Sequence, residues 1–330
     1  MEIEKNPAEQ EKIKPELQSK PINKKPKSNK KPFIWGLVVG LVIIVIIMIG
    51  FGAYRLYKAE ATDSYTMFLA KYLPFPAATV NGQTITYNEV KTDTDTLLYY
   101  LEQQAENNSL YEVPSYDEIF QETLTGLIEQ AIIEQEAEQR NIEVTQEEID
   151  QNLEEIKQAA ESAGEEVEVT LEQRYGWTID QFIDRALRPQ LLQAELAQSV
   201  AEDDSIEQNQ KARELITQIS QDINNEEITF EEAAAEYSDD ETTAQSGGEL
   251  GVSSPGDFVP EFEEALENLE IGEVSDVVTT IYGYHIIKLL DKTEEEGKTQ
   301  YTSAHILLMT TSFEEWLTEQ VEVASLKKYF

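Results

Sequence analysis

The sequence predicts an α+β protein with a single transmembrane helix, a mostly helical middle region and an antiparallel sheet towards the C-terminal end. Three observations support this prediction. An uncharged apolar stretch occupies residues 33–54, helix-start signals recur over residues 76–200, and two apolar, strand-like runs hold the only two histidines, His285 and His305. A chain of 330 residues is long enough for about two domains with buried cores.

Residues 33–54 have the length and composition of a membrane-spanning helix, because about 20 apolar residues cross a hydrocarbon core of about 30 Å. Lysines crowd the N-terminal side of this stretch, whereas only Arg55 and Lys58 follow it closely. Since positive charge is retained on the cytoplasmic side, the N-terminus is expected in the cytoplasm and everything after the helix outside it. The expected location is therefore the cell membrane, with a single pass through the lipid bilayer.

The residues on either side of the apolar stretch indicate how the chain is placed across the membrane. Residues 1–32 are rich in Lys, Glu and Pro, which predicts a disordered cytoplasmic tail, and residues 55–75 are expected to form a juxtamembrane linker. A cleaved signal peptide is the alternative, because Ala59-Glu60-Ala61 resembles a cleavage site. The apolar run is longer than the usual signal-peptide run of about 7–15 residues, which favours an uncleaved anchor.

Charge is distributed very unevenly along the chain, whose formal net charge is −40. The first 55 residues hold ten of the 25 basic residues and five of the 65 acidic ones, so the remainder is strongly acidic. Nucleic acid is not expected as a partner, because phosphate binding needs clustered cations. The absence of cysteine excludes disulfides and thiol catalysis, and the two histidines lack a metal-binding spacing, so no metal site is expected.

Helix-start signals recur between residues 76 and 200. Val80-Asn81-Gly82 reads as the end of a strand followed by a tight turn, since Asn-Gly favours such turns. Capping boxes, in which a hydroxyl caps a backbone amide three residues on and the later side chain reaches back, then mark four helix starts. These pairs are Thr86/Glu89, Ser115/Glu118, Thr145/Glu148 and Thr178/Gln181, and they predict helices near 87–106, 116–140, 146–162 and 179–200.

An ordered set of motifs leads up to and includes the first histidine. The motifs are Glu236-Tyr-Ser-Asp-Asp240, Gly247-Gly-Glu-Leu-Gly251, Phe258-Val-Pro-Glu-Phe262, Ile271-Gly-Glu-Val-Ser275 and Tyr282-Gly-Tyr-His-Ile-Ile287. In this order and spacing they resemble the parvulin family of peptidyl-prolyl isomerases. The resemblance implies a four-stranded antiparallel sheet with surrounding helices over residues 201–311, and an enzyme that isomerises X-Pro peptide bonds.

One strand of the parvulin pattern stands out of order. The family begins with a strand similar to residues 303–308, which here follow the last strand instead of preceding the helix at 206–219. A truncated second copy is the alternative, but the roughly twenty residues that follow are too few for a core. A circularly permuted domain, with its first strand supplied by 301–309, is therefore expected, because the family's first and last strands are sheet neighbours and need no crossover. His285 and His305 would then lie side by side.

The resemblance also implies the residues of the isomerase site. The catalytic polar centre, carried over position by position, consists of His305, His285, Asp240 and Thr280. The prolyl pocket, for whose members ordinary core packing is the alternative role, is expected to consist of Leu250, Phe258, Phe262 and Tyr282. Rotation about an amide bond makes and breaks no covalent bond, so no cofactor is expected. Val252-Ser253 replaces the aromatic residue usual after Gly-x-Leu-Gly, which leaves a slow isomerase as an alternative.

The region from 76 to 200 is similar to the N-terminal chaperone lobe of extracytoplasmic foldases of the SurA and PrsA type. The similarity rests on Val80–Gly82, on Leu127–Ala137 and on Arg140–Ile149, and it is looser than the parvulin resemblance because its motifs are largely helix patterns. It implies that residues 312–330 form a C-terminal helix that returns to the chaperone lobe.

Together these features predict a membrane-anchored extracytoplasmic foldase. It would catalyse cis-trans isomerisation of X-Pro bonds in exported proteins and hold unfolded, proline-containing polypeptides as its partners. A non-catalytic holdase with a degenerate parvulin domain is the alternative. A purely structural membrane protein does not explain why both histidines and the glycine motifs gather in one region, and a hydrolase would need a nucleophile-elbow context that the serines lack.

Overall fold

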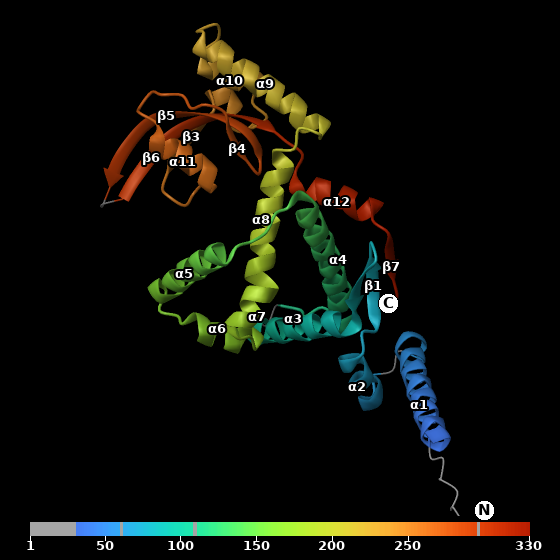
Figure 1. Ribbon diagram of the computed structural model, residues 1–330. Coiled ribbons are helices and arrows are strands. Elements are labelled where there is room, and N and C mark those ends of the chain that lie inside the picture. The colour runs from blue at the N-terminus through green and yellow to red at the C-terminus, as the bar shows by residue number, and fades with distance from the viewer. Residues whose placement is uncertain (1–30, 60–61, 108–110, 296–297) are drawn as a thin grey trace, which may run out of the picture.

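The computed structural model shows three parts in succession (Figure 1): helix α1 at one end, a part built mainly of helices in the middle, and a sheet with its helices at the other end. The α+β class is confirmed, with antiparallel sheets and one long apolar helix. Residues 1–30, which make up most of the expected cytoplasmic tail, lie outside the described residues. The structure describes residues 31–59, 62–107, 111–295 and 298–330.

Helix α1 (Lys31–Lys58) contains the uncharged stretch, and within the described ranges it is the one helix long and apolar enough to cross a membrane. Its candidate span is Leu41–Lys58. Residues 55–75 are not the plain linker expected, because they include the last turn of α1 and a second helix, α2 (Ser64–Tyr72). The carboxylate of Asp63 accepts two backbone N–H groups at the start of α2, a cap that lies outside the capping-box pattern.

We call residues 76–201 together with 313–330 the helical lobe. It begins with a hairpin whose turn residues, Asn81 and Gly82, both have positive φ (49° and 91°), as the Asn-Gly pair predicts. The elements of this lobe before its C-terminal segment are β1 (Pro76–Val80), β2 (Gln83–Thr86), α3 (Tyr87–Asn107), α4 (Tyr116–Arg140), α5 (Gln146–Ser162), α6 (Val167–Tyr175), α7 (Ile179–Phe182) and α8 (Arg188–Ala201).

The capping pairs read from the sequence form at every expected helix start. Ser115, Thr145 and Thr178 each make both bonds of a capping box. At the start of α3, Thr86 Oγ1 accepts the N–H of Glu89, whose carboxylate accepts the N–H of Thr86. Helices α3, α4 and α5 therefore begin where the sequence predicts.

The expectation of one helix over 179–200 is wrong in detail. A π-helical turn (Ile183–Leu187) separates α7 from α8. Pro189 lacks the N–H that an α-helix would pair with the carbonyl of Arg185, so the chain widens there instead of continuing as a regular helix. Helix α6 was not expected, because its N-cap residue Glu166 makes no side-chain capping bond and leaves no signature in the sequence.

The C-terminal segment returns to the helical lobe, but residues 312–330 are not one helix. Helix α12 (Phe313–Val323) ends early, and β7 (Leu326–Lys328) pairs antiparallel with β1, forming a three-stranded sheet in the order β2-β1-β7. Trp316 is buried with residues of α4 and α8, namely Ile133, Leu196 and Val200.

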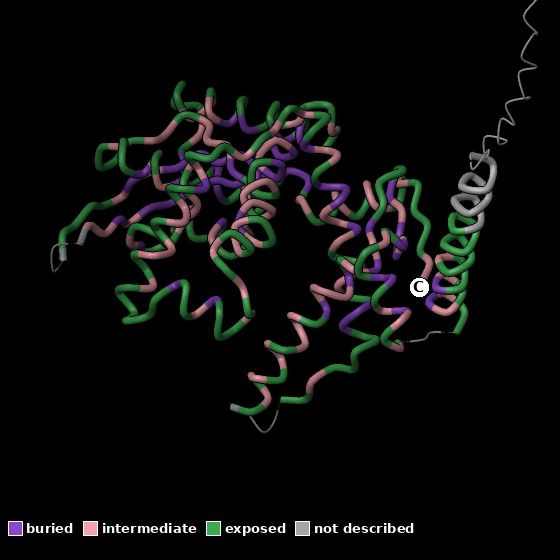
Figure 2. The backbone as a smooth tube through the Cα atoms, turned by 60° about the horizontal axis from the view of Figure 1, so that its bottom comes forward, coloured by how far each residue is buried: buried purple, intermediate pink, exposed green. Residues whose placement is uncertain are grey.

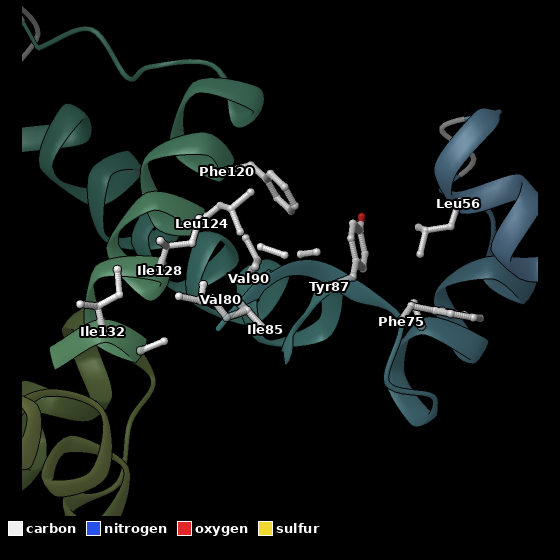
Figure 3. Close-up of a cluster of buried hydrophobic side chains, with 14 of the residues drawn as sticks. Leu56, Phe75, Val80, Ile85, Tyr87, Val90, Phe120, Leu124, Ile128 and Ile132 are labelled. Atoms are coloured by element: carbon white, nitrogen blue, oxygen red, sulfur yellow. The ribbon is translucent and has the colours of Figure 1, made fainter. Parts of the chain in front are cut away.

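One hydrophobic core joins the end of α1 to the hairpin, α3 and α4 (Figure 3). Val80, Val90 and Leu124 are fully buried at its centre, while Leu56 of α1 and Phe75 extend it towards the apolar helix. Each such aliphatic side chain stabilises the fold by about 1.5–3 kcal/mol. The core of the helical lobe is therefore continuous with the end of α1.

We call residues 207–309 the sheet lobe. Its four-stranded antiparallel sheet has the order β3-β6-β5-β4, so the late strand β6 lies in the interior of the sheet. The strands are β3 (Glu249–Ser253), β4 (Val278–Thr280), β5 (Gly283–Glu295) and β6 (Lys298–Met309), and the helices are α9 (Glu207–Asn224), α10 (Phe230–Tyr237) and α11 (Pro260–Asn268).

Alternation along the strands sorts the side chains of the sheet lobe onto two faces. Tyr284 and Ile286 lie in a cluster with residues of α9 and α10, whereas Ile287 and Leu289 lie in a cluster with Phe262 of α11. Figure 2 shows buried residues along the strands of this lobe. Both histidines belong to the face covered by α11.

Two segments connect the lobes, one between α8 and α9 and one between β6 and α12. The buried side chain of Asn209 holds both of them. Its Nδ2 donates to the carbonyl of Val200 at 2.7 Å, and its Oδ1 accepts the N–H of Thr311 at 2.8 Å. The hydroxyl of Tyr284 also donates to the carbonyl of Ala201 at 3.3 Å. These bonds fix the junction from which the sheet lobe extends.

Candidate functional site

His285 and His305 lie on adjacent antiparallel strands, β5 and β6. The register pairs His285 with Leu307 and Ile287 with His305, which places the two imidazoles diagonally on the same face. Both are buried, and their Nδ1 atoms are 3.3 Å apart. The expectation that the histidines lie side by side is confirmed.

The segment before Asp240 is bonded to β6, which fixes the carboxylate beside His305. Asp239 donates its N–H to the carbonyl of Leu307 at 2.7 Å, and Ser238 Oγ accepts the N–H of Leu307 at 3.1 Å. Asp240 Oδ2 then lies 3.0 Å from Nε2 of His305. Its two oxygens also accept hydrogen bonds from the hydroxyls of Thr242 and Thr243.

Thr280 closes the other end of this chain of polar groups. It lies at the end of the short strand β4, is fully buried, and its Oγ1 is 2.9 Å from Nε2 of His285. The same oxygen accepts the N–H of Tyr282 at 3.1 Å. A threonine hydroxyl that already accepts one bond is free to donate its proton to the imidazole.

The distances in this network fit the following order of protons. Ionised Asp240 accepts from Nε2–H of His305, whose unprotonated Nδ1 then accepts from Nδ1–H of His285. Nε2 of His285 in turn accepts the hydroxyl proton of Thr280. With His285 neutral, this order gives each of these ring nitrogens a hydrogen-bond partner.

Burial and hydrogen bonding act on the pKa values in the direction this order requires. Burial, together with the nearby His305, lowers the pKa of His285 to about 3. Burial alone would raise the pKa of Asp240, but the hydrogen bonds from Thr242, Thr243 and His305 outweigh it and hold that pKa well below its usual range. A neutral His285 and an ionised Asp240 result at neutral pH.

An apolar pocket of about 620 Å³ opens beside the two histidines. Phe262 lines it, with its ring edge-on to His285 at 5.4 Å between centroids and with its ring centroid 4.7 Å from that of Phe258. The pocket thus gathers six of the eight residues named from the sequence, and Asp240 and Thr280 bond to its histidines. Its lining residues are Leu250, Asp257, Phe258, Val259, Pro260, Phe262, Tyr282, His285, His305 and Leu307.

Several residues that shape this site were not identified from the sequence. Leu307 lines the pocket because it lies two residues after His305 on the same strand face, a signal that the period of the strand carries. Glu263 accepts the N–H groups of Gly256 at 2.6 Å and Phe258 at 3.1 Å and so holds the loop that carries Phe258. In the sequence Glu263 looks like any acidic residue in the first turn of a helix.

Within the described ranges, no three His, Cys, Asp or Glu side chains converge as a metal site. The site consists of a hydrogen-bonded chain of a hydroxyl, two imidazoles and a carboxylate beside an apolar pocket. Such an arrangement excludes water from a bound apolar ring while presenting oriented hydrogen-bonding groups at one side of it.

The lowered pKa of His285 predicts a loss of stability on acidification. Because its folded-state pKa of about 3 lies below the unfolded value of 6.5, the unfolded chain binds the proton first as pH falls. The contribution of neutral His285 to the free energy of unfolding is therefore fully present above about pH 6.5. It declines towards pH 3, by up to about 1.4 kcal/mol per pH unit. Urea unfolding of the wild type and of His285→Gln between pH 7 and pH 4.5 measures the free energy of unfolding at each pH. If this free energy fell with pH equally steeply in both proteins, the prediction would be contradicted.

Two family models match the chain. The SurA-like N-terminal domain matches residues 24–197, more than half of the chain, and the PPIC-type PPIase domain matches residues 196–291. The first match covers the apolar helix and most of the helical lobe. The second covers the sheet lobe up to β5 and ends before β6.

Relatives with curated names are chaperones and foldases. The chain is 38% identical to the chaperone SurA of Salmonella typhimurium over 125 residues, which cover 36% of this chain and 29% of that protein. It is 32% identical to the foldase protein PrsA of Halalkalibacterium halodurans over 191 residues, covering 51% of this chain and 57% of that protein. In both cases the match spans less than two thirds of the relative.

Solved structures of similar proteins include the peptidylprolyl isomerase PrsA from Bacillus cereus. It is 20% identical, the match covers 76% of this chain and 83% of that one, and the TM-score is 0.23. The foldase protein PrsA from Streptococcus pneumoniae is 18% identical, with coverages of 74% and 83% and a TM-score of 0.22.

Proposed function

The chain belongs to the family of the SurA-like N-terminal domain, and from this premise we propose that it is a membrane-anchored extracytoplasmic foldase. In this proposal the sheet lobe catalyses cis-trans isomerisation of X-Pro bonds in exported proteins. The helical lobe holds the same unfolded, proline-containing clients. Neither activity requires a cofactor.

A single observation carries the catalytic part of the proposal. An apolar pocket of about 620 Å³ ends on two hydrogen-bonded histidines that are themselves oriented by a carboxylate and a hydroxyl. A prolyl ring is apolar, and the amide nitrogen that belongs to it carries no proton. The pocket therefore suits a group that offers apolar surface and has no N–H to be paired.

Isomerisation of an X-Pro bond is a rotation about the amide C–N bond. Twisting an X-Pro amide costs about 18–20 kcal/mol because it breaks the resonance between nitrogen and carbonyl. Water stabilises the planar amide, whose resonance separates charge, more than the twisted one. A pocket that replaces water by apolar side chains removes part of this preference and so favours the twisted state. Phe258, Phe262, Leu250 and Tyr282 supply that surface in the proposal.

The polar residues take distinct parts in this scheme. His305 and His285 line the pocket, which supports their role as the catalytic residues that would face the bound amide. Asp240 lies behind His305 with both oxygens already bonded, which supports a role in orienting His305 rather than in touching the substrate. Thr280 orients His285 in the same way. The burial of Thr280, His285 and His305 keeps this geometry fixed while the substrate twists.

We further propose that the isomerase domain is circularly permuted over residues 201–311. The family match ends at residue 291, while β6 runs between β3 and β5 and contributes His305 to the site. These two facts support a late strand that takes the place of an early one. The hairpin from β5 to β6 makes the connection without a crossover.

The anchor completes the proposal. Helix α1 would cross the membrane once, through residues 33–54, with the basic N-terminal side in the cytoplasm. The helical lobe and the sheet lobe would then both face the outside of the cell. The strongly acidic composition after residue 55 keeps these parts soluble there.

A second pocket supports client holding by the helical lobe. It has a volume of about 370 Å³ and lies between α3, α4 and the turn that precedes α8. Trp177 and Tyr175, whose rings stack at 5.2 Å, form one wall, and Leu97 and Leu127 supply apolar surface. Gly126 of α4 leaves open space in this pocket, since no heavy atom lies within 4 Å of a Cβ placed there.

Trp177→Ala is expected to weaken client holding without changing isomerisation of a short peptide. The change removes the largest apolar wall of the helical-lobe pocket, and truncating such a side chain costs about 1–2 kcal/mol, or roughly tenfold in affinity. Suppression of aggregation of an unfolded protein measures holding. Tyr111→Ala, an exposed aromatic outside the pocket, is the matched control, and equal losses in both variants would contradict the assignment.

The proposed function is tested by two assays on the full chain in detergent or vesicles. A protease-coupled assay on an X-Pro peptide measures isomerisation, and delayed aggregation of an unfolded protein measures holding. The foldase proposal expects both. Holding without any acceleration of X-Pro exchange would leave a non-catalytic holdase, and the absence of both would overturn the proposal.

A further inference from the structure

Helix α2 turns two aromatic side chains away from the protein. Its buried face consists of Thr66, Leu69 and Ala70, which pack inwards. The opposite face carries Phe68 and Tyr72, which are 60% and 65% exposed and whose rings lie 5.0 Å apart. Large apolar side chains gathered on one exposed helix face indicate an interaction surface.

This helix lies against the end of α1. The hydroxyl of Tyr65 donates to the backbone carbonyl of Met48 at 2.8 Å. The side chain of Leu69 fits against Gly52 so closely that a Cβ at Gly52 would lie 2.4 Å from its Cδ1. The beginning of α2 therefore lies beside residues that belong to the candidate membrane span.

The connection between the two helices is fixed by one ion pair. Arg55 near the end of α1 lies 2.8 Å from the carboxylate of Asp63, which also caps α2. Together with the contacts of Tyr65 and Leu69, this ion pair joins α2 to the end of α1. Its depth relative to a membrane follows from that of α1.

Exposed aromatic residues continue from α2 onto α1. Phe51 and Tyr54 are 52% and 62% exposed, and the guanidinium of Arg55 lies over the ring of Phe51 at 5.7 Å. On α2, Lys71 lies over the ring of Tyr72 at the same distance. Aromatic rings beside basic side chains are typical of the interface between hydrocarbon and lipid headgroups.

We infer that α2 is an interfacial helix that lies in the outer headgroup region of the bilayer, with Phe68 and Tyr72 inserted among the lipids. The inference rests on the proposed membrane anchor and extends it from one helix to two. Lipid is the occupant that fits, because the exposed face continues the apolar surface of α1 and carries positive charge in a part of the chain that is strongly acidic. Lys71 is placed to meet anionic headgroups.

The absence of cysteine from the sequence allows a direct test with single spin labels. Full-length Phe68→Cys and Tyr72→Cys are labelled and reconstituted into vesicles of phosphatidylethanolamine and phosphatidylglycerol. Collisions with oxygen, which dissolves in lipid, are compared with collisions with a water-soluble nickel complex. Phe51→Cys on α1 is the lipid-exposed reference, and Glu319→Cys on the exposed side of α12 is the reference for water.

At residues 68 and 72, oxygen collisions are expected to exceed nickel collisions, as at residue 51, whereas the order reverses at residue 319. Nickel-dominated collisions at 68 and 72 with lipid exposure at 51 would overturn the interfacial helix and leave the anchor intact. Protection from both reagents would show that protein covers this face, which also overturns the inference. Water exposure at 51 as well would remove the anchor itself.

Discussion

Replacing Gly248 by alanine is expected to destabilise the sheet lobe by about 2–5 kcal/mol. Gly248 has φ +81°, and a Cβ at this position would lie 2.1 Å from the carbonyl oxygen of His305. Its other near neighbours are also backbone atoms of His305, at 3.1 and 3.2 Å, so no side chain can rotate away. The carbonyl of Gly248 accepts the N–H of His305 at 2.9 Å, which means that relief of the clash would displace the strand that carries the histidine.

Gly251→Ala is the matched control, because Gly251 has the same φ of +81° but no heavy atom within 4 Å of its Cβ position. It retains the backbone strain, about 1–2 kcal/mol, without the collision. Urea unfolding gives the two free energies, and amide hydrogen exchange in β6 locates the change. Equal destabilisation by the two substitutions would show that close approach to His305 is not what requires glycine at position 248.

Helix starts were the most predictable part of the fold. Thr145 and Ser115 can be recognised as helix starts from the sequence, because each capping residue and its partner lie three positions apart. The signal for the helix start is therefore entirely local. The Asn81-Gly82 turn is local in the same sense, since both residues favour the positive φ that the hairpin needs. Elements specified by their own few residues were therefore placed to within about one position.

Elements that depend on distant partners were missed. Strand β7 is exposed at all three residues, so no alternation marks it, and it exists because β1, far away in the sequence, offers a free edge. The π-helical turn follows from Pro189, which has no N–H to pair with the carbonyl of Arg185, four residues earlier. Helix α6 lacks a capping side chain and is held by its packing.

At the site, the sequence predicts which residues take part but not the hydrogen bonds between them. The resemblance placed His285 and His305 on neighbouring strands, and the structure brings them together. The order of protons from Thr280 to Asp240 depends on distances between side chains from different elements, which no spacing encodes. The hydroxyls of Thr242 and Thr243, which neutralise the cost of burying Asp240, were passed over for the same reason. The catalytic and binding roles of these residues stay predictions.

His305→Ala is expected to lower kcat/KM for an X-Pro peptide by on the order of 10- to 100-fold, equivalent to about 1.4–2.8 kcal/mol of lost transition-state stabilisation. The imidazole of His305 lines the pocket and bonds to both His285 and Asp240, so its removal breaks the chain of hydrogen bonds at its middle. The protease-coupled assay measures the rate. Circular dichroism and suppression of aggregation, which depends on the helical lobe, should stay at wild-type values, and Glu319→Ala should leave the rate unchanged.

A pair of substitutions at Asp240 then separates orientation from charge. Asp240→Asn keeps an oxygen that can accept the Nε2–H of His305, whereas Asp240→Ala removes it. If Asp240 acts by orienting the imidazole, Asn retains most of the rate and Ala loses it to about the extent of His305→Ala. Equal losses in both variants would instead assign the effect to the negative charge. Wild-type rates in all three variants would remove this site from the reaction, because no step could then depend on the chain of bonds that ends at Asp240.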